Sequence, residues 1–195
     1  EYDPVITENA IDWLNNHASD VNPWFLCVGL VNPHDVMWFP VDQKWHFEEN
    51  PEYTKNTKRL LEKRKWGRKN NLPGFSEFVP EYLNKLPINF YDDLDTKPLV
   101  HKAWMEMMLK HSLPGIIDPE DERLWIMQLN YYLHLHFLND RCLERILITL
   151  DQNDLWKNTI IIFTSDHGDQ CGSHKLRSKG PWNYQETLNV PLYIV

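Results

Sequence analysis

Long hydrophobic runs are absent from the sequence, and cysteine and glycine are scarce. The 195 residues include 3 cysteines and 7 glycines, but 13 prolines and 9 tryptophans. So few cysteines, spaced so far apart, cannot form a disulfide framework, and the composition is that of a folded protein and not of a disordered one. The longest apolar runs have the length of a strand, far below the roughly 20 residues of a membrane span. We therefore expect a globular chain without a membrane span.

Positive charge is also in short supply. The formal net charge is -8, whereas a protein that binds nucleic acid needs a basic stripe that displaces counterions from the phosphate backbone. A nucleic-acid partner is therefore not expected. The one basic cluster, "KRLLEKRKWGRK" at residues 58–69, is more typical of a solvated helix face than of a binding patch.

Two amphipathic helices are predicted. Apolar residues recur at helical spacing over roughly Ile6–Ser19. A second helix is expected to begin at Asp118, where a cap residue, a proline at the first helical position and acids in the first turn follow one another. It should continue to about Leu150 along one apolar stripe. The stripe consists of Leu124, Met127, Tyr131, Leu135, Leu138, Cys142 and Ile146.

Three continuous apolar segments, rich in β-forming residues, predict strands that are buried on both faces. They are Trp24–Leu30, Thr159–Thr164 and Val190–Val195. Strands that alternate with helices indicate an α/β fold with a largely parallel sheet flanked by helices. The residues from Met37 to about Lys110 are instead expected to form loops and short helices.

Polar residues follow two of these strands. His34 and Asp35 come after the first, and Asp166 and His167 come after the second. Ligands of open α/β sheets bind at the carboxyl ends of the strands. If the two strands are parallel, both pairs of residues emerge at the same edge of the sheet, which makes this edge the candidate site.

Asp166 and His167 are the candidate metal ligands. Gly168 follows them and allows a tight turn that could direct both side chains at one ion. A carboxylate oxygen together with an imidazole nitrogen suits a metal of the Mn, Zn or Fe kind better than an all-oxygen calcium cage. The alternative is structural: Asp166 caps a helix, and His167 is an ordinary surface histidine.

Lys179 and His34 are the candidates for anion binding. Lys179 lies in "SKGP", where turn residues could present its ammonium to a tetrahedral oxyanion. His34 lies in "NPHD" and could donate to an anion or protonate a leaving group. The alternatives are a solvated lysine and a histidine that only stabilises a turn.

The cysteines suggest one further alternative. Cys27 lies in the first predicted strand and Cys142 on the helix stripe, so both thiols are expected to be inert core packing. Cys171 and His174 have a spacing that zinc accepts, with the preceding Asp-His pair as further ligands. Structural zinc ligands usually come as two separated pairs, a pattern that this sequence lacks.

Several segments together resemble a known family. "NTIIIFTSDHGDQCGSHKLRSKGPWNYQETLNVPLYIV" has a strand, an Asp-His-Gly turn, a Gly-x-His stretch, a Lys-Gly segment and a Val-Pro-Leu strand in the order and spacing of the sulfatase family of the alkaline phosphatase superfamily. "PWFLCVGLVNPHD" resembles the family's strand that ends in Pro-His, and "LPINFYDDLDTKP" a characteristic middle segment. "NYYLHLHFLNDRCLERIL" resembles the long helix with an internal aspartate, here Asp140.

The resemblance implies roles for the site residues. Asp166 and His167 would be metal ligands, Lys179 would contact the sulfate or phosphate-type group and its leaving oxygen, and His34 would contact the same group. Family members often have Asn in place of His167, alongside calcium. A histidine at position 167 resembles the branch of the family that includes phosphonate monoester hydrolases and choline sulfatases, for which manganese is plausible. The implied cofactor is a divalent metal, Ca or Mn, with Mg or Zn as alternatives, and the implied substrate is a small anionic sulfate or phosphonate ester.

The family's nucleophile motif does not occur in the chain. It reads Cys-x-Pro/Ala-x-Arg, its Cys or Ser becomes formylglycine, and a further acidic pair of metal ligands accompanies it. The resemblance therefore implies that residues 1–195 are part of a sulfatase-like catalytic domain, α/β and alkaline-phosphatase-like, incomplete at the N-terminus. We expect the chain alone to be inactive and its main partner to be the missing N-terminal part of the same domain.

Two other functions stay open besides sulfate ester hydrolysis. One is hydrolysis of phosphonate or phosphate monoesters or diesters in the same superfamily. The other is a non-catalytic sulfatase-like module that binds an anion. The resemblance is compatible with a periplasmic or secreted location. Lys175 stands where the family usually has glycine, which affects the turn after His174.

Overall fold

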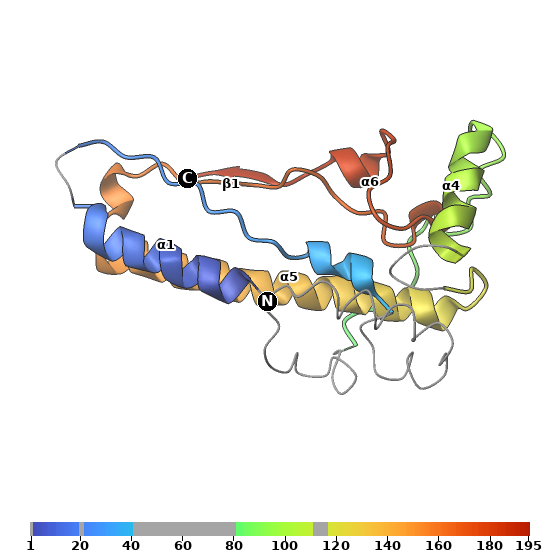
Figure 1. The fold of residues 1–195 in the computed structure, drawn as a ribbon, viewed down its shortest axis with the longest axis horizontal. Coiled ribbons are helices and arrows are strands. Elements are labelled where there is room, and N and C mark those ends of the chain that lie inside the picture. The colour runs from blue at the N-terminus through green and yellow to red at the C-terminus, as the bar shows by residue number, and fades with distance from the viewer. Residues whose placement is uncertain (1, 20–21, 41–80, 111–116) are drawn as a thin grey trace, which may run out of the picture. The chain divides into compact units, whose positions relative to one another are not determined.

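The computed structural model describes residues 2–19, 22–40, 81–110 and 117–195 (Figure 1). Its elements in chain order are α1 (Asp3–His17), the 3-10 helix η1 (His34–Trp38), α4 (Leu99–Lys110), α5 (Glu122–Gln152), η3 (Trp156–Asn158), β1 (Ile162–Thr164), η4 (Ser173–Lys175), α6 (Gln185–Leu188) and β2 (Leu192–Ile194). None of the helices within the described ranges is both long and apolar enough to cross a membrane.

The chain divides into two compact units. Unit 1 comprises Glu1–Asp35, Leu135–Asp166 and Val190–Val195, and unit 2 comprises Val36–His134 and His167–Asn189. The helix α5 contributes its first part to unit 2 and its second part to unit 1. Each unit has its own set of buried residues.

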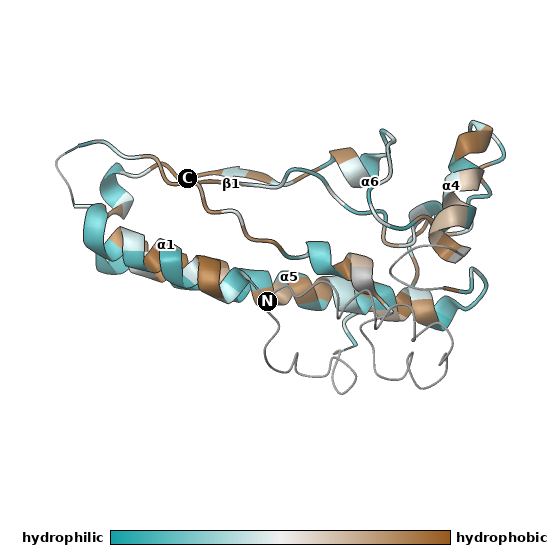
Figure 2. Ribbon diagram, viewed as in Figure 1, coloured by the Kyte–Doolittle hydropathy of each residue, from teal (hydrophilic) through white to brown (hydrophobic). Residues whose placement is uncertain are grey.

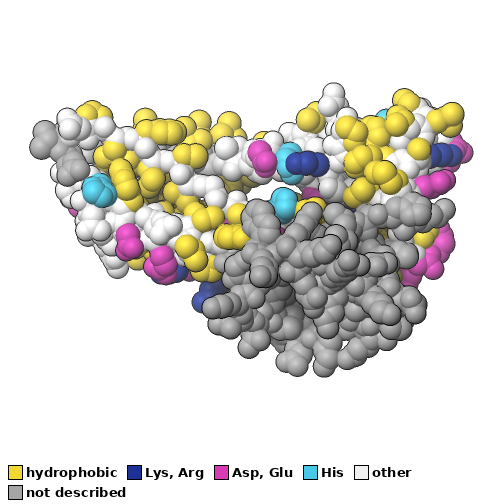
Figure 3. Space-filling view, in the orientation of Figure 1, with side chains coloured by type: hydrophobic (Ala, Val, Ile, Leu, Met, Phe, Trp, Pro, Cys, Tyr) yellow, Lys and Arg dark blue, Asp and Glu magenta, His cyan; other side chains and the backbone are white. Residues whose placement is uncertain are grey.

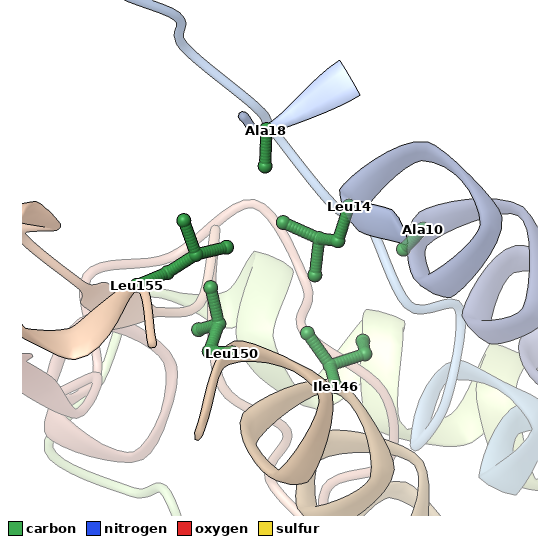
Figure 4. Packing of buried hydrophobic residues seen from close by; sticks show 6 residues of the cluster. All are labelled: Ala10, Leu14, Ala18, Ile146, Leu150 and Leu155. Carbon is green, nitrogen blue, oxygen red and sulfur yellow. The ribbon is translucent and has the colours of Figure 1, made fainter. Parts of the chain in front are cut away.

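In unit 1, α1 packs on the second part of α5. The predicted helix over Ile6–Ser19 is confirmed with slightly earlier bounds. Leu14 is only 2% exposed and lies against Ile146 and Leu150 of α5 (Figure 4). The complete cluster consists of Ala10, Leu14, Ala18, Ile146, Leu150 and Leu155. The helical spacing of small and aliphatic residues in α1 therefore marks the face that is buried.

The long helix is confirmed, but its start was predicted too early. Residues 118–121 form a turn in which Asp118 Oδ1 accepts the N–H of Glu120 at 2.9 Å. It is Asp121 whose Oδ1 accepts the N–H of Arg123, at 3.1 Å, and the Arg123 guanidinium lowers the pKa of this carboxyl. Four residues suited to a helix start stand in a row here, and only the folded chain decides which of them satisfies the first amide groups.

The buried face of α5 also differs in part from the predicted stripe. Hydrophobic and hydrophilic bands alternate along the helix (Figure 2). Tyr131, Leu135 and Ile146 are buried as predicted, whereas Met127 is 39% exposed and Trp125 is fully buried in its place. The buried aromatic side chain of Trp125 lies edge-on to Phe90, with ring centroids 5.4 Å apart.

The predicted strands are shorter and more exposed than expected. Within the described residues, the only pairing of strands is antiparallel, between β1 and β2, with Phe163 opposite Tyr193. Both strands are exposed, and hydrophobic side chains gather over them in Figure 3. The expectation of strands buried on both faces is therefore wrong for this chain, and the largely parallel sheet is not confirmed.

The first predicted strand, Trp24–Leu30, forms no strand and runs as an irregular segment. Phe25 is 89% exposed, and Cys27 is exposed as well, so the expected burial of this thiol is wrong. Cys142 is half-buried. An apolar run indicates that a segment packs against other apolar groups, but it does not specify which groups these are.

The expected loops and short helices between Met37 and Lys110 are described only in part. The end of η1, the irregular residues 81–98 and the helix α4 agree with the prediction. The basic cluster at residues 58–69 lies outside the described residues. Asn130 of α5 fixes the irregular segment, because its Oδ1 accepts the N–H groups of Tyr82 at 2.6 Å and Leu83 at 2.8 Å.

The core of unit 1 makes a testable prediction. Leu14→Ala should lower the free energy of unfolding by about 2–5 kcal/mol, because it leaves a cavity against α5. Val5→Ala is the matched control on the same helix, since Val5 is 59% exposed, and it should change stability by roughly 0.5 kcal/mol or less. Urea denaturation followed by tryptophan fluorescence measures both. Equal effects of the two substitutions would contradict the packing described here.

Candidate functional site

The predicted site residues are distributed over the two units. His34, Asp35 and Asp166 belong to unit 1, and His167 and Lys179 belong to unit 2. A hollow of about 760 Å³ along α5 beside Trp156 contains none of them. Asp166, His167 and Lys179 lie on loops, and His34 and Asp35 lie at the start of η1.

The Pro-His corner of unit 1 is held by a buried carboxylate. Asp3, at the start of α1, is 4% exposed, and its two oxygens accept the N–H groups of Val31 at 2.6 Å and Asn32 at 3.0 Å. The amide of Asn139 on α5 donates to the carbonyl of Asn32. These contacts fix the backbone two residues before His34. Sequence reasoning missed Asp3, although an acid in the first turn of an amphipathic helix is visible in the sequence.

His34 itself is accessible. Its side chain is 53% exposed, and its Nδ1 lies 3.8 Å from Asp35 Oδ1. The corner thus presents a histidine that solvent and small anions can reach.

Asp166 follows the end of β1. Its carboxylate is exposed, and Oδ1 lies 3.4 Å from the hydroxyl of Ser165. No helix begins at this residue: the next helical element along the chain is η4, which starts at Ser173. The alternative in which Asp166 caps a helix is therefore not supported.

His167 and Lys179 are brought together in unit 2. His167 Nδ1 lies 2.9 Å from the carbonyl of Gly168, and because a carbonyl only accepts, Nδ1 carries the proton. The lone pair is then on Nε2, and Lys179 Nζ donates to it at 2.9 Å. The sequence predicted these two residues for one cleft, and they are in direct contact.

Glycine at position 168 is required by a close approach of two backbone segments. A Cβ atom there would collide with the carbonyl oxygen of Glu186. The N–H of Gly168 donates to the carbonyl of Thr187 at 2.8 Å. The sequence suggested a tight turn as the reason for this glycine, whereas the structure shows the packing of α6 against it.

Lys175, in the turn after His174, has a backbone conformation that favours glycine. Lys175 has a φ of 55°, in the left-handed region where glycine is favoured. Its ammonium donates to Glu120 Oε1 at 2.6 Å and lies 5.4 Å from the centre of the Phe90 ring. These contacts counteract the cost of the left-handed backbone at Lys175.

His174 is a buried anchor. It is 8% exposed, its backbone N–H donates to the carbonyl of Asn89 at 3.0 Å, and its Nδ1 lies 3.0 Å from Asp92 Oδ2. Asn89 Nδ2 lies 3.2 Å from His174 Nε2 and also donates to Glu186 Oε1 at 2.6 Å. The middle segment and the segment before β2 are thereby joined around one imidazole.

The zinc alternative finds no support. The buried Cys171 donates its backbone N–H to Asp169 Oδ1 at 2.9 Å, and burial, together with the Asp169 carboxylate, raises the pKa of its thiol. A protonated thiol is a poor zinc ligand. Moreover, no group of three or more His, Cys, Asp or Glu side chains in the described part of the chain is placed to hold a metal.

Comparison with known proteins identifies the family. The model of the family described as Sulfatase matches residues 1–195. The chain belongs to the sulfatase family. The resemblance inferred from the sequence motifs is thus confirmed at the level of the sulfatase family and the alkaline phosphatase superfamily, while the Asp-His-Gly branch stays a prediction.

Individual sulfatases resemble the chain over nearly its entire length. It is 29% identical to the uncharacterized sulfatase YidJ of Escherichia coli K12 over 191 residues, which are 97% of this chain and 30% of that protein. It is 28% identical to iduronate 2-sulfatase of Homo sapiens over 202 residues, which are 97% of this chain and 30% of that protein. The chain therefore spans less than a third of the length of these relatives.

A solved sulfatase structure has a similar fold. A 2-O GAG sulfatase superposes with a TM-score of 0.63 at 22% identity, over 98% of this chain and 34% of the other. This likeness supports the sulfatase-like, alkaline-phosphatase-like architecture expected from the sequence.

The close approach at Gly168 can be tested with a second glycine as control. Gly168→Ala should lower the free energy of unfolding by about 1–3 kcal/mol, because a backbone carbonyl must move to admit the methyl group. Gly29→Ala should be close to neutral, since nothing lies within 4 Å of the added Cβ. Urea denaturation of both variants measures the difference. A neutral Gly168→Ala would show that α6 does not pack there.

The state of Cys171 can be tested by alkylation. At pH 8 iodoacetamide should modify the exposed Cys27 and leave Cys171 intact in the folded chain, because burial and the nearby Asp169 favour the neutral thiol. In denaturant both should react. Because the pKa of Cys171 is raised, the folded state keeps the thiol proton at a pH where the unfolded state releases it. The free energy of unfolding should therefore fall as the pH rises above the ordinary thiol pKa of about 8.5. Peptide mass spectrometry that finds both thiols equally modified at pH 8 would contradict the burial.

Proposed function

We propose that the protein to which this chain belongs hydrolyses sulfate esters. The observation that carries the proposal is the closeness of His167 and Lys179, with Nε2 and Nζ 2.9 Å apart, in a chain that matches the sulfatase family throughout. An imidazole and an ammonium that meet beside an exposed carboxylate form a polar centre suited to a metal and an anion. The nucleophile, a formylglycine, would come from outside residues 1–195.

Asp166 and His167 would supply two ligands to a divalent metal. They fit this role, because the Asp166 carboxylate is exposed and the Gly168 carbonyl orients His167 so that its Nε2 carries the lone pair. When bound, the metal would supply Lewis-acid stabilisation of negative charge. A nitrogen donor in the set favours manganese over calcium, with magnesium or zinc as further candidates. Because one lone pair serves one partner, Nε2 can accept from Lys179 or bind a metal, but not both.

Lys179 would stabilise the transferred group. In this proposal its ammonium contacts the sulfate and the leaving oxygen, and His34 contacts the same group. Positioned cations at a developing negative charge are often worth several kcal/mol of transition-state stabilisation. The net charge of -8 is no obstacle, because local cations set the potential within a small site.

The second candidate function is hydrolysis of phosphonate or phosphate esters. His167 favours this second function, since a histidine at this position resembles the Asp-His-Gly branch, which includes phosphonate monoester hydrolases. A non-catalytic anion-binding module is the third candidate. For the sulfatase and the phosphonate hydrolase alike, a periplasmic or secreted location is part of the proposal.

The proposal is tested on the full-length protein with 4-nitrophenyl sulfate. Lys179→Ala should lower kcat/KM by about a hundredfold or more, because the charge that offsets the leaving oxygen is lost. Lys97→Ala is the matched control, because Lys97 is an exposed lysine of the same unit, and it should change kcat/KM less than about twofold.

A phosphonate monoester assayed in parallel separates the candidates. Faster turnover of the sulfate ester supports the sulfatase, and faster turnover of the phosphonate supports the second function. Sulfate ester hydrolysis that survives Lys179→Ala unchanged would refute the role of this residue. No turnover of either ester, with inorganic sulfate still bound, would favour the non-catalytic module.

A further inference from the structure

Thr187 is a buried hydroxyl residue to which the sequence gives no role. It lies on α6 and is 7% exposed. Its backbone and side chain both bind the loop that carries the candidate site residues. The backbone carbonyl accepts the N–H of Gly168 at 2.8 Å, which fixes the residue that follows His167.

The hydroxyl of Thr187 makes two further hydrogen bonds to the same loop. Its oxygen accepts from Gln170 Nε2 at 2.9 Å, and its proton goes to the carbonyl of Lys179 at 3.1 Å. One hydroxyl can do both, because it has one donor and two acceptor lone pairs. Thr187 therefore contacts the loop near both of its ends, at residues 168–170 and at residue 179.

Gln170 makes this arrangement specific. Its side chain is 2% exposed, and its Oε1 has no hydrogen-bond partner among the residues that the structure describes. Within the described residues, the bond to Thr187 is therefore the hydrogen bond that compensates the burial of the Gln170 side-chain amide. Gln170 also donates its backbone N–H to the carbonyl of Ser178 at 3.1 Å, so the two ends of the loop are joined directly beside the hydroxyl.

These bonds fix the backbone of the two residues whose side chains meet. Lys179 Nζ reaches His167 Nε2 at 2.9 Å, yet Lys179 is exposed, and little packing surrounds its side chain. A long flexible side chain keeps such a contact best when the backbone beneath it is fixed. Thr187 binds the Lys179 carbonyl and the amide next to His167 at the same time.

We propose that Thr187 is a positioning residue, which sets the place of Lys179 relative to His167 through its hydroxyl group. This inference rests on the sulfate ester hydrolysis proposed above. It concerns the hydroxyl alone, since a valine of the same shape would retain the backbone bond to Gly168. It predicts that the hydroxyl affects turnover more than substrate binding.

The test compares Thr187→Val with Thr187→Ser in the full-length protein on 4-nitrophenyl sulfate. The valine variant should lower kcat by about tenfold or more with KM changed less than about threefold, because small displacements of a catalytic group cost turnover. The serine variant restores the hydroxyl and should retain kcat within about threefold. A valine variant with the kcat of the wild type, or a serine variant as impaired as valine, would overturn the proposal.

A second readout does not depend on activity. Succinimidyl acetate should acetylate Lys179 faster in Thr187→Val than in the wild type, while the rate at Lys97 stays unchanged, as measured by peptide mass spectrometry. An unchanged rate at Lys179 overturns the proposal. So does a valine variant that unfolds at a lower temperature but has wild-type kcat well below that temperature, because the hydroxyl would then serve stability alone.

The two proposals fail in distinguishable ways. If Lys179→Ala leaves turnover unchanged, the proposed function of the site is wrong, and with it the positioning role. If Lys179→Ala abolishes turnover but Thr187→Val does not lower it, only the role of Thr187 is wrong.

Discussion

Both hydrophobic cores depend on a single helix. α5 has 31 residues and is therefore about 46 Å long. Its first part buries Trp125 and Tyr131 in unit 2, and its second part buries Ile146 and Leu150 in unit 1. Most of the stability of a protein helix comes from the packing of its apolar face, so the helix and the two cores stabilise each other. The loops that carry the polar residues are attached to these cores.

Buried polar side chains hold the loops that carry the candidate site residues. Asp3 binds two consecutive amides before His34, Asn130 brackets the backbone at residues 82–83, and Thr187 joins the two ends of the loop between His167 and Lys179. A buried polar group is costly unless it is hydrogen-bonded. Each of these side chains therefore favours one backbone geometry over others, which is what a site composed of loops requires.

The chemistry of the candidate site is local. The chain is acidic as a whole, but Lys179 and His167 place a cation and an imidazole nitrogen side by side. The proposed reaction class comes from the matching family, and the geometry identifies residues that could take part in it. His174 and Cys171 lie in the same loop but are buried, with Asp92 and Asp169 as partners, so the loop contains both accessible and buried polar groups.

Local sequence patterns are sufficient to predict the two long helices, the family, and the polar residues that follow the apolar segments. These features depend on residues close together in the chain: the spacing of Leu14 and its neighbours, or the order of Asp166, His167 and Gly168. The folded chain was needed to reveal the antiparallel pairing of β1 with β2, the exposure of Cys27, and the anchoring roles of Asp3 and Thr187. The physical reason is that strand direction, burial and the partner of a buried polar atom all depend on segments far away in sequence, which no local pattern of side chains specifies.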